Sequence, residues 1–252
     1  MRTVRSGVLA VAMAALFSVS FFPVIASADD DAVETGRLLA ILLDSGRVVI
    51  GANQPLINDP DKGDKGFTPE VFEKQLTDKF KERAKVDLGK LKDEKVPAQA
   101  KVLLPQLVDA SKKTVVDYQP VINKQGVGFK GFIPATFGTQ AAAKFSSKYG
   151  IYLKQTMLDS GLRNPKNKAD EFEANVMKKF ADPSYPRQGE KIVSEATDGG
   201  KVTRVLLPLY YGKGCLGCHG DPKGEKDISG YSKEGAKEGD FGGAISVKLA
   251  EK

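Results

Sequence analysis

The sequence is poor in side chains that bind metals through nitrogen or sulfur: it has one histidine, two cysteines and four methionines. A structural zinc site needs four ligands, so a zinc ion here would have to recruit a distant carboxylate. The sequence has one long apolar run, within residues 1–28, and after residue 28 no stretch could cross a membrane. These shortages argue against a Cys/His zinc domain and exclude any further membrane span.

An export signal is predicted over residues 1–28. Arg2 and Arg5 precede the apolar run GVLAVAMAALFSVSFFPVIA, and a small-x-small site at 26–28 is typical of cleavage. Because the run is close to the roughly 20 residues that span a bilayer, an uncleaved N-terminal anchor is the alternative. Cleavage lowers the formal charge from +6 to +4, which is too small to predict nucleic-acid binding. We therefore expect a periplasmic or otherwise exported protein.

Helical patterns dominate the segment after the signal. Apolar residues recur at helical spacing over 31–54, and Thr68 with Pro69 predicts the start of another helix. Two more helices are expected over 98–116 and 134–150, and the glycine that ends the last pattern predicts its C-terminus.

Strand patterns follow from residue 151. The segment 151–157 is β-rich, and a helix is expected over 168–181 with Asn167 as its N-cap. The segments EKIVSEA and KVTRVLLPLYY flank TDGG and predict a hairpin, and FGGAISVKLA predicts a final strand. The charged segment 223–240 predicts a solvated loop.

These patterns predict the α+β class. We expect an antiparallel sheet within residues 151–252 and a helical region over 29–150 that packs alongside it. Residues 1–28 are the signal peptide in this division of the chain.

The segment CLGCH at 215–219 holds both cysteines and the histidine. Cys-x-x-Cys-His predicts one covalent c-type haem, in which Cys215 and Cys218 form thioethers and His219 binds the iron. A redox-active dithiol and a zinc site are the alternatives, but neither explains all three residues together. Export supplies the compartment in which such haem attachment takes place.

The opposite face of the iron has few candidate ligands. Without a second histidine, bis-histidine ligation within one chain is excluded. Met157, at the end of a β-rich segment, is the better methionine candidate, and Met177 is the weaker, with core packing as the alternative for both. Otherwise the sixth position is open, water-bound or taken by an unusual donor. Arg163 and Arg204 are candidates for pairing with the haem propionates, against a surface or turn-stabilising role.

The sequence resembles a family of exported c-type haem proteins with a PAS-like domain. The resemblance rests on INDPDKGDKGFTPE (57–70), RNPKNKADEFE (163–173), CLGCHGDP (215–222) and GDFGGAISVKLA (239–250). It implies a PAS-like antiparallel sheet preceded by helices, with haem on the two cysteines and the histidine as proximal ligand. Members occur alone or as sensory input domains, and this sequence contains no kinase or other output domain.

We predict a periplasmic monohaem c-type cytochrome that transfers single electrons to an unidentified redox partner. The alternative is a redox or gas sensor that binds a small ligand at the sixth iron position. An enzyme such as a peroxidase is not expected, because no distal histidine is left for acid–base work. A docking face for an acidic partner, or only a solvated surface, is predicted for five lysines: Lys166, Lys168, Lys178, Lys179 and Lys191.

Overall fold

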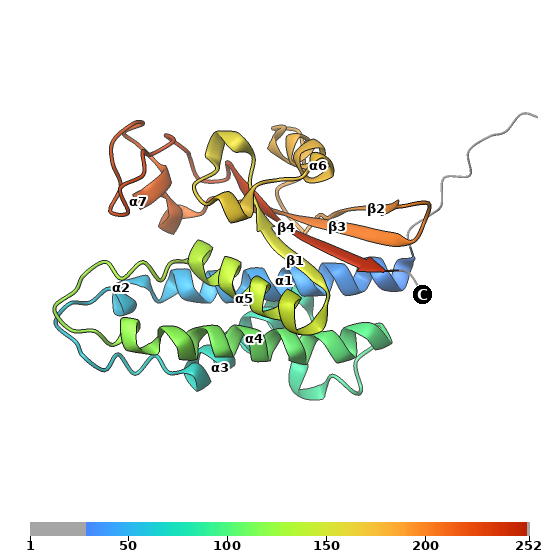
Figure 1. Ribbon diagram of the computed structural model, residues 1–252, viewed down its shortest axis with the longest axis horizontal. Coiled ribbons are helices and arrows are strands. Elements are labelled where there is room, and N and C mark those ends of the chain that lie inside the picture. Colours follow the sequence, from blue (N-terminus) through green and yellow to red (C-terminus); the bar gives the residue numbers. More distant parts are fainter. Residues whose placement is uncertain (1–28, 251–252) are drawn as a thin grey trace, which may run out of the picture.

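The N-terminal half of the fold is a layer of helices. The computed structural model describes residues 29–250. Its first five helices are α1 (Asp30–Ala52), α2 (Gln54–Ile57), α3 (Pro69–Ala84), α4 (Ala98–Ile122) and α5 (Pro134–Tyr149). Figure 1 shows the long helices stacked beneath one face of the sheet. The predicted signal or anchor at 1–28 lies outside the described residues, and no helix within 29–250 is long and apolar enough to cross a membrane.

The C-terminal half forms an antiparallel sheet of four strands. Its elements are β1 (Tyr152–Thr156), α6 (Glu171–Ala181), β2 (Val193–Thr197), β3 (Val202–Tyr210), α7 (Leu216–His219) and β4 (Phe241–Ala250). The strand order is β1-β4-β3-β2, and every neighbouring pair is antiparallel. The predicted α+β class, with N-terminal helices alongside an antiparallel sheet, is confirmed. The finer PAS-like assignment stays a prediction.

The side chains of β3 alternate between two apolar layers. Val205 and Leu207 face the helical layer and belong to the large core that also contains α1, α3, α4 and α5. Leu206 faces the other way and packs with Met177 and Phe180 of α6. Helix α1 lies directly on this strand, since a Cβ at Gly36 would lie 2.7 Å from Cγ2 of Val205. Helices and sheet therefore share one continuous core, which fixes the end of β3 relative to α1.

Two predicted helix boundaries are wrong. Asn167 does not cap α6: Asp170 does, in a capping box with Glu173. Asn167 is instead buried, and its side-chain oxygen accepts a hydrogen bond from Thr139 at 3.0 Å. Helix α4 runs six residues beyond the predicted end at 116, because its buried face continues to Ile122.

Candidate functional site

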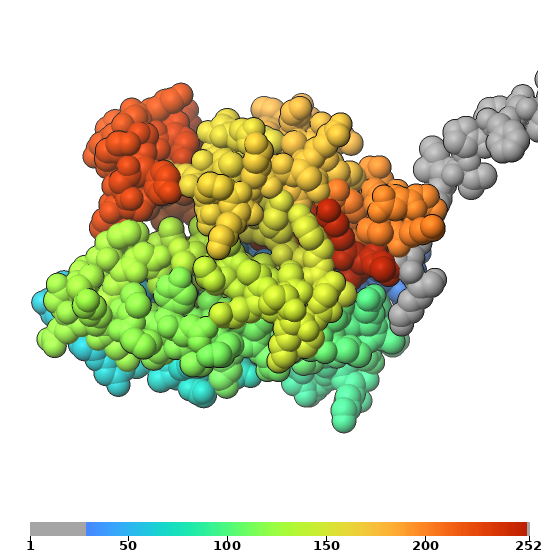
Figure 2. All heavy atoms as spheres, in the orientation of Figure 1, coloured from blue at the N-terminus to red at the C-terminus, as the bar shows by residue number. Residues whose placement is uncertain are grey.

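The CLGCH motif lies in a lobe formed by residues 211–240, which we call the motif lobe. It begins where β3 ends and returns to the sheet at the start of β4. Its two ends are tied together: the Tyr211 amide donates to the Asp240 carbonyl at 2.9 Å, and the Gly239 amide donates to the Tyr211 carbonyl at 2.8 Å. Figure 2 shows the lobe, in orange-red, as a protrusion at one end of the molecule. The motif is therefore held on the rim of the fold.

The imidazole of His219 is fixed from two sides. Its ring stacks on Tyr211, with centroids 4.6 Å apart and planes 25° apart. Its Nδ1 lies 2.9 Å from Oε2 of Glu234, a residue of the same lobe. A neutral imidazole that donates its Nδ1 proton to a carboxylate carries its lone pair on Nε2. Nε2 is then the nitrogen available to a metal.

Burial favours the neutral form of this imidazole. Burial lowers the pKa of His219, the positive charge of Arg163 lowers it further, and the hydrogen bond to Glu234 opposes both. Metal ligation requires an unprotonated nitrogen, so this environment suits a ligand. Burial also raises the pKa of Tyr211 to about 12, which keeps its phenol neutral beside the ring.

Arg163, in the segment after β1, connects that segment to the motif lobe. Its Nε and Nη2 each lie 3.0 Å from a different oxygen of Glu234, and its Nη1 lies 2.6 Å from Oδ2 of Asp227. Nη2 also donates to the carbonyl of Cys218 at 2.9 Å. The Tyr231 hydroxyl donates to the Arg163 carbonyl at 3.0 Å. One guanidinium thus holds the motif and the carboxylates of Asp227 and Glu234 in register.

Cys215 and Cys218 are free thiols, and each residue is half-buried. Burial raises the pKa of the Cys218 thiol, and the charge of Asp227 raises it further. A redox-active dithiol works through a thiolate with a lowered pKa. The shift at Cys218 therefore runs against the dithiol alternative.

Open space lies beside the glycines of the motif. A Cβ at Gly212, Gly214 or Gly217 would meet no other atom within 4 Å, whereas a Cβ at Gly220 would lie 2.6 Å from the Leu216 carbonyl oxygen. Gly220 therefore serves the tight turn that ends α7. The other three leave a bare main-chain surface next to both thiols and the imidazole.

The family of the chain follows from its sequence profile. The profile of the Tll0287-like family matches residues 90–250. The chain belongs to the Tll0287-like family. Among solved structures, the crystal structure of the cyanobacterial haem protein Tll0287 is similar, with a TM-score of 0.41 and 13% identity over 61% of this chain and 94% of that chain. No curated protein matches the chain.

The Tll0287-like match covers every part of the site described so far. It runs from the segment before α4 to the end of β4 and so includes Arg163, the motif and Glu234. The expected family resemblance is confirmed. Sequence reasoning missed Glu234, because the charges of 223–240 indicated only a solvated loop, and Tyr211, because KVTRVLLPLYY indicated only a strand.

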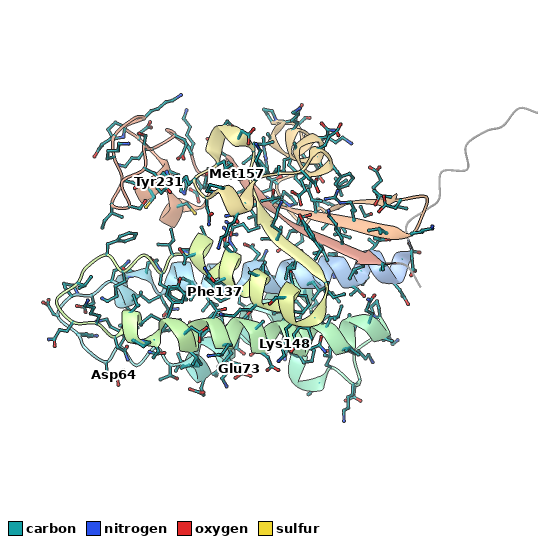
Figure 3. The ribbon with its side chains drawn as sticks, viewed as in Figure 1. Asp64, Glu73, Phe137, Lys148, Met157 and Tyr231 are labelled. Carbon is teal, nitrogen blue, oxygen red and sulfur yellow. The ribbon has the colours of Figure 1, made fainter. Side chains whose placement is uncertain are left out.

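The two methionine candidates lie in different surroundings. Met157 is half-buried at the end of β1, where a Cβ at Gly243 would lie 3.4 Å from its Sδ. Figure 3 shows Met157 at the end of the sheet nearest the lobe that carries Tyr231. Met177 is fully buried in the apolar cluster of α6, so it fills the core. A ligand role for Met157 stays a prediction.

Arg204 lies at the far end of β3 from the motif. Its Nη2 is 2.8 Å from Oδ2 of Asp170 and 3.6 Å from Oε1 of Glu173. Its guanidinium also covers the ring of Phe172, with Cζ 4.2 Å from the centroid. Of the two arginines predicted to pair with propionates, the fold brings only Arg163 to the motif, and that guanidinium already binds Glu234 and Asp227.

Two buried polar atoms near the end of the sheet that leads into the motif lobe have no hydrogen-bond partner within residues 29–250: Nε of Arg47 on α1 and Oε1 of Gln155 on β1. They converge on Gly138 of α5, where a Cβ would lie 2.6 Å from Oε1 of Gln155 and 2.8 Å from Cδ of Arg47. The charge of Arg47 also acts on Tyr211. A polar position without partners thus lies between the helical layer and the inner face of β1.

Two surface pockets of about 390 and 240 Å³ are lined by residues outside the CLGCH motif. The larger is lined by Tyr152, Arg204 and Lys248 and the smaller by Arg83 and Tyr210, among others. Within residues 29–250, no group of three or more His, Cys, Asp and Glu side chains is arranged to hold a metal ion. The zinc alternative gains no support from this arrangement.

Proposed function

We propose that this protein is an exported monohaem c-type cytochrome that carries single electrons. Cys215 and Cys218 form the thioethers to the haem, and Nε2 of His219 binds its iron. The observation that carries the proposal is the contact of His219 Nδ1 with Glu234, which directs the lone pair to Nε2 beside two free thiols. A bound haem supplies a one-electron iron centre, and no substrate chemistry is assigned.

The residues around the motif fit such a group. Each cysteine is half-buried and free, so each sulfur can form a bond to a vinyl carbon. The bare main chain at Gly214 and Gly217 allows a flat ring to approach. Tyr211 keeps the imidazole from rotating, and metal-binding histidines normally donate their second nitrogen to a carboxylate, as His219 does. The five lysines of the predicted docking face are all exposed, which suits an acidic redox partner.

Mass spectrometry and absorption spectroscopy of the exported protein test this assignment. We expect the mature chain to carry an extra mass of about 616 Da that survives denaturation, because thioethers are covalent. Cys215→Ala and Cys218→Ala should each retain haem through one thioether, and the double variant should lose it on denaturation. A native protein without the added mass, or a double variant that keeps it, would overturn the assignment.

The second candidate function is binding of a small ligand, and Arg47 with Gln155 supports it. Buried donors and acceptors without partners, such as Nε of Arg47 and Oε1 of Gln155, can hydrogen-bond a small polar molecule. Titration of the ferrous protein with CO and NO tests this function. Gas binding that weakens at least threefold in Gln155→Leu would support a gas sensor, whereas a spectrum unchanged by either gas would exclude gas sensing and leave electron transfer and a redox sensor.

A further inference from the structure

We propose that Glu234 is a positioning residue that sets the reduction potential of the iron through Nδ1 of His219. The inference rests on the proposed function and adds the group that tunes it. Glu234 would not touch the iron. It would act only through the hydrogen bond that it accepts from the imidazole.

The carboxylate of Glu234 is oriented by more than its own chain. Arg163 binds it through two parallel contacts of 3.0 Å, one to each oxygen, and such a fork fixes the plane of the carboxylate. Oε2 then faces Nδ1 of His219 at 2.9 Å. The amide of Ala236 donates to the His219 carbonyl at 2.8 Å, so the main chain next to Glu234 is also tied to the motif.

Arg163 itself is held by a second acid. Asp227 has a fully buried side chain whose Oδ2 binds Nη1 of Arg163 at 2.6 Å. Its other oxygen accepts from the amide and hydroxyl of Ser229 and from the amide of Tyr231. Asp227 thus places the guanidinium, the guanidinium places Glu234, and Glu234 places the imidazole.

The hydrogen bond from His219 to Glu234 affects the electron density that the imidazole can donate to a bound iron. A carboxylate that accepts the Nδ1 proton makes the imidazole a more basic ligand. A more basic ligand stabilises ferric iron more than ferrous iron and lowers the reduction potential. Arg163 limits the effect, because its positive charge is shared with the same carboxylate.

Three variants of the haem-loaded protein separate the hydrogen bond from simple charge. Glu234→Gln removes the charge and the strong acceptor, Glu234→Asp keeps a carboxylate, and Glu225→Gln removes an exposed carboxylate of the same lobe that pairs with Lys233. The readouts are the midpoint potential and the iron–histidine stretching frequency of the ferrous protein. Covalent haem content and the urea midpoint establish that each variant is loaded and folded.

Glu234→Gln should favour ferrous iron at least tenfold, which is about 59 mV for one electron, and should lower the iron–histidine frequency. Glu225→Gln should change the equilibrium less than threefold, and Glu234→Asp should lie between the native protein and Glu234→Gln. Equal shifts in Glu234→Gln and Glu225→Gln, or an unchanged frequency in Glu234→Gln, would overturn the role of Glu234. A native protein without covalent haem would instead overturn the proposed function, so the two failures are distinguishable.

Discussion

Two polar clusters of the C-terminal half are built in opposite ways. The Arg163 cluster joins one cation to the carboxylates of Asp227 and Glu234 and to the motif. The Glu173 cluster surrounds one fully buried carboxylate with donors: Lys154 Nζ at 2.7 Å, Tyr152 hydroxyl at 2.9 Å and Thr156 hydroxyl at 3.0 Å. In the Arg163 cluster one guanidinium binds two carboxylates, and in the Glu173 cluster one carboxylate accepts from several donors.

The elements beneath the clusters differ as well. Tyr152, Lys154 and Thr156 belong to β1, and Glu173 is in the first turn of α6, so regular elements fix the geometry of the Glu173 cluster. The Arg163 cluster connects a segment between short 3-10 turns to the loop before β4. A cluster on regular elements can stabilise the whole fold, whereas a cluster on loops mainly positions the group that it holds. Similar ion pairs therefore serve stability in one place and orientation in the other.

Glu173→Gln should have the largest effect on global stability. Without the carboxylate, the Tyr152 and Thr156 hydroxyls and the Asp170 amide lose a charged acceptor, and each buried donor left unsatisfied costs about 1–3 kcal/mol. Urea unfolding followed by circular dichroism measures this loss. The control is Glu195→Gln on β2, an exposed carboxylate in the cross-strand position next to Arg204, which should change stability by less than about 0.5 kcal/mol. Equal stabilities of the two variants would contradict the structural role of Glu173.

Arg163→Gln should have a smaller and more local effect. Asp227 and Glu234 would lose their shared cation, and an unsatisfied buried acceptor costs about 1–3 kcal/mol. Because the cluster lies on loops, we expect faster hydrogen exchange at the amides of Gly235, Ala236 and Gly239, with the amides of β4 unchanged. Equal acceleration throughout β4 would show that the Arg163 cluster supports the whole fold, and the distinction between the two clusters would fail.

Local patterns were sufficient for the regular elements. The alternation of FGGAISVKLA predicted β4 with its bounds, and Asp198, Gly199 and Gly200 form the predicted turn with positive φ angles. Thr68 caps α3 as expected, with its hydroxyl accepting from the Val71 amide. These features depend on residues that are close in sequence, so the sequence itself displays them.

Features that depend on distant residues could not be predicted in this way. The cap at Asp170 is an exception that a local pattern displays, because Glu173 three residues later completes its capping box. Glu234 lies 71 residues from Arg163. Because this partner is not visible in the local sequence, the charges of the loop indicated only a solvated segment. The three motif residues were identified from spacing alone, but the carboxylate that orients His219 required the fold.

Lowering the pH should have the smallest effect on stability and should act on the two clusters through different carboxyl groups. Asp170, whose amide donates to Glu173, represents the Glu173 cluster. Burial raises the pKa of Asp170, but hydrogen bonds from the Glu173 amide and Arg204 outweigh burial and lower the pKa to about 2. In the Arg163 cluster, Ser229 and Arg163 likewise overcome burial and lower the pKa of Asp227 to about 2. A carboxyl with a lowered folded-state pKa contributes stability above its ordinary pKa near 4 and loses that contribution as the pH falls toward 2.

Both contributions are therefore present at neutral pH, but they should report on different events. The free energy of global unfolding should fall between about pH 4 and pH 2, with a shallower slope in Asp170→Asn. Asp227→Asn should leave that slope close to native and instead flatten the acid-induced rise in hydrogen exchange of the motif lobe. Urea titrations and exchange measurements at matched pH values test both expectations. If Asp227→Asn flattened the global slope as much as Asp170→Asn, the motif lobe would unfold together with the sheet, and the two clusters would form a single cooperative unit.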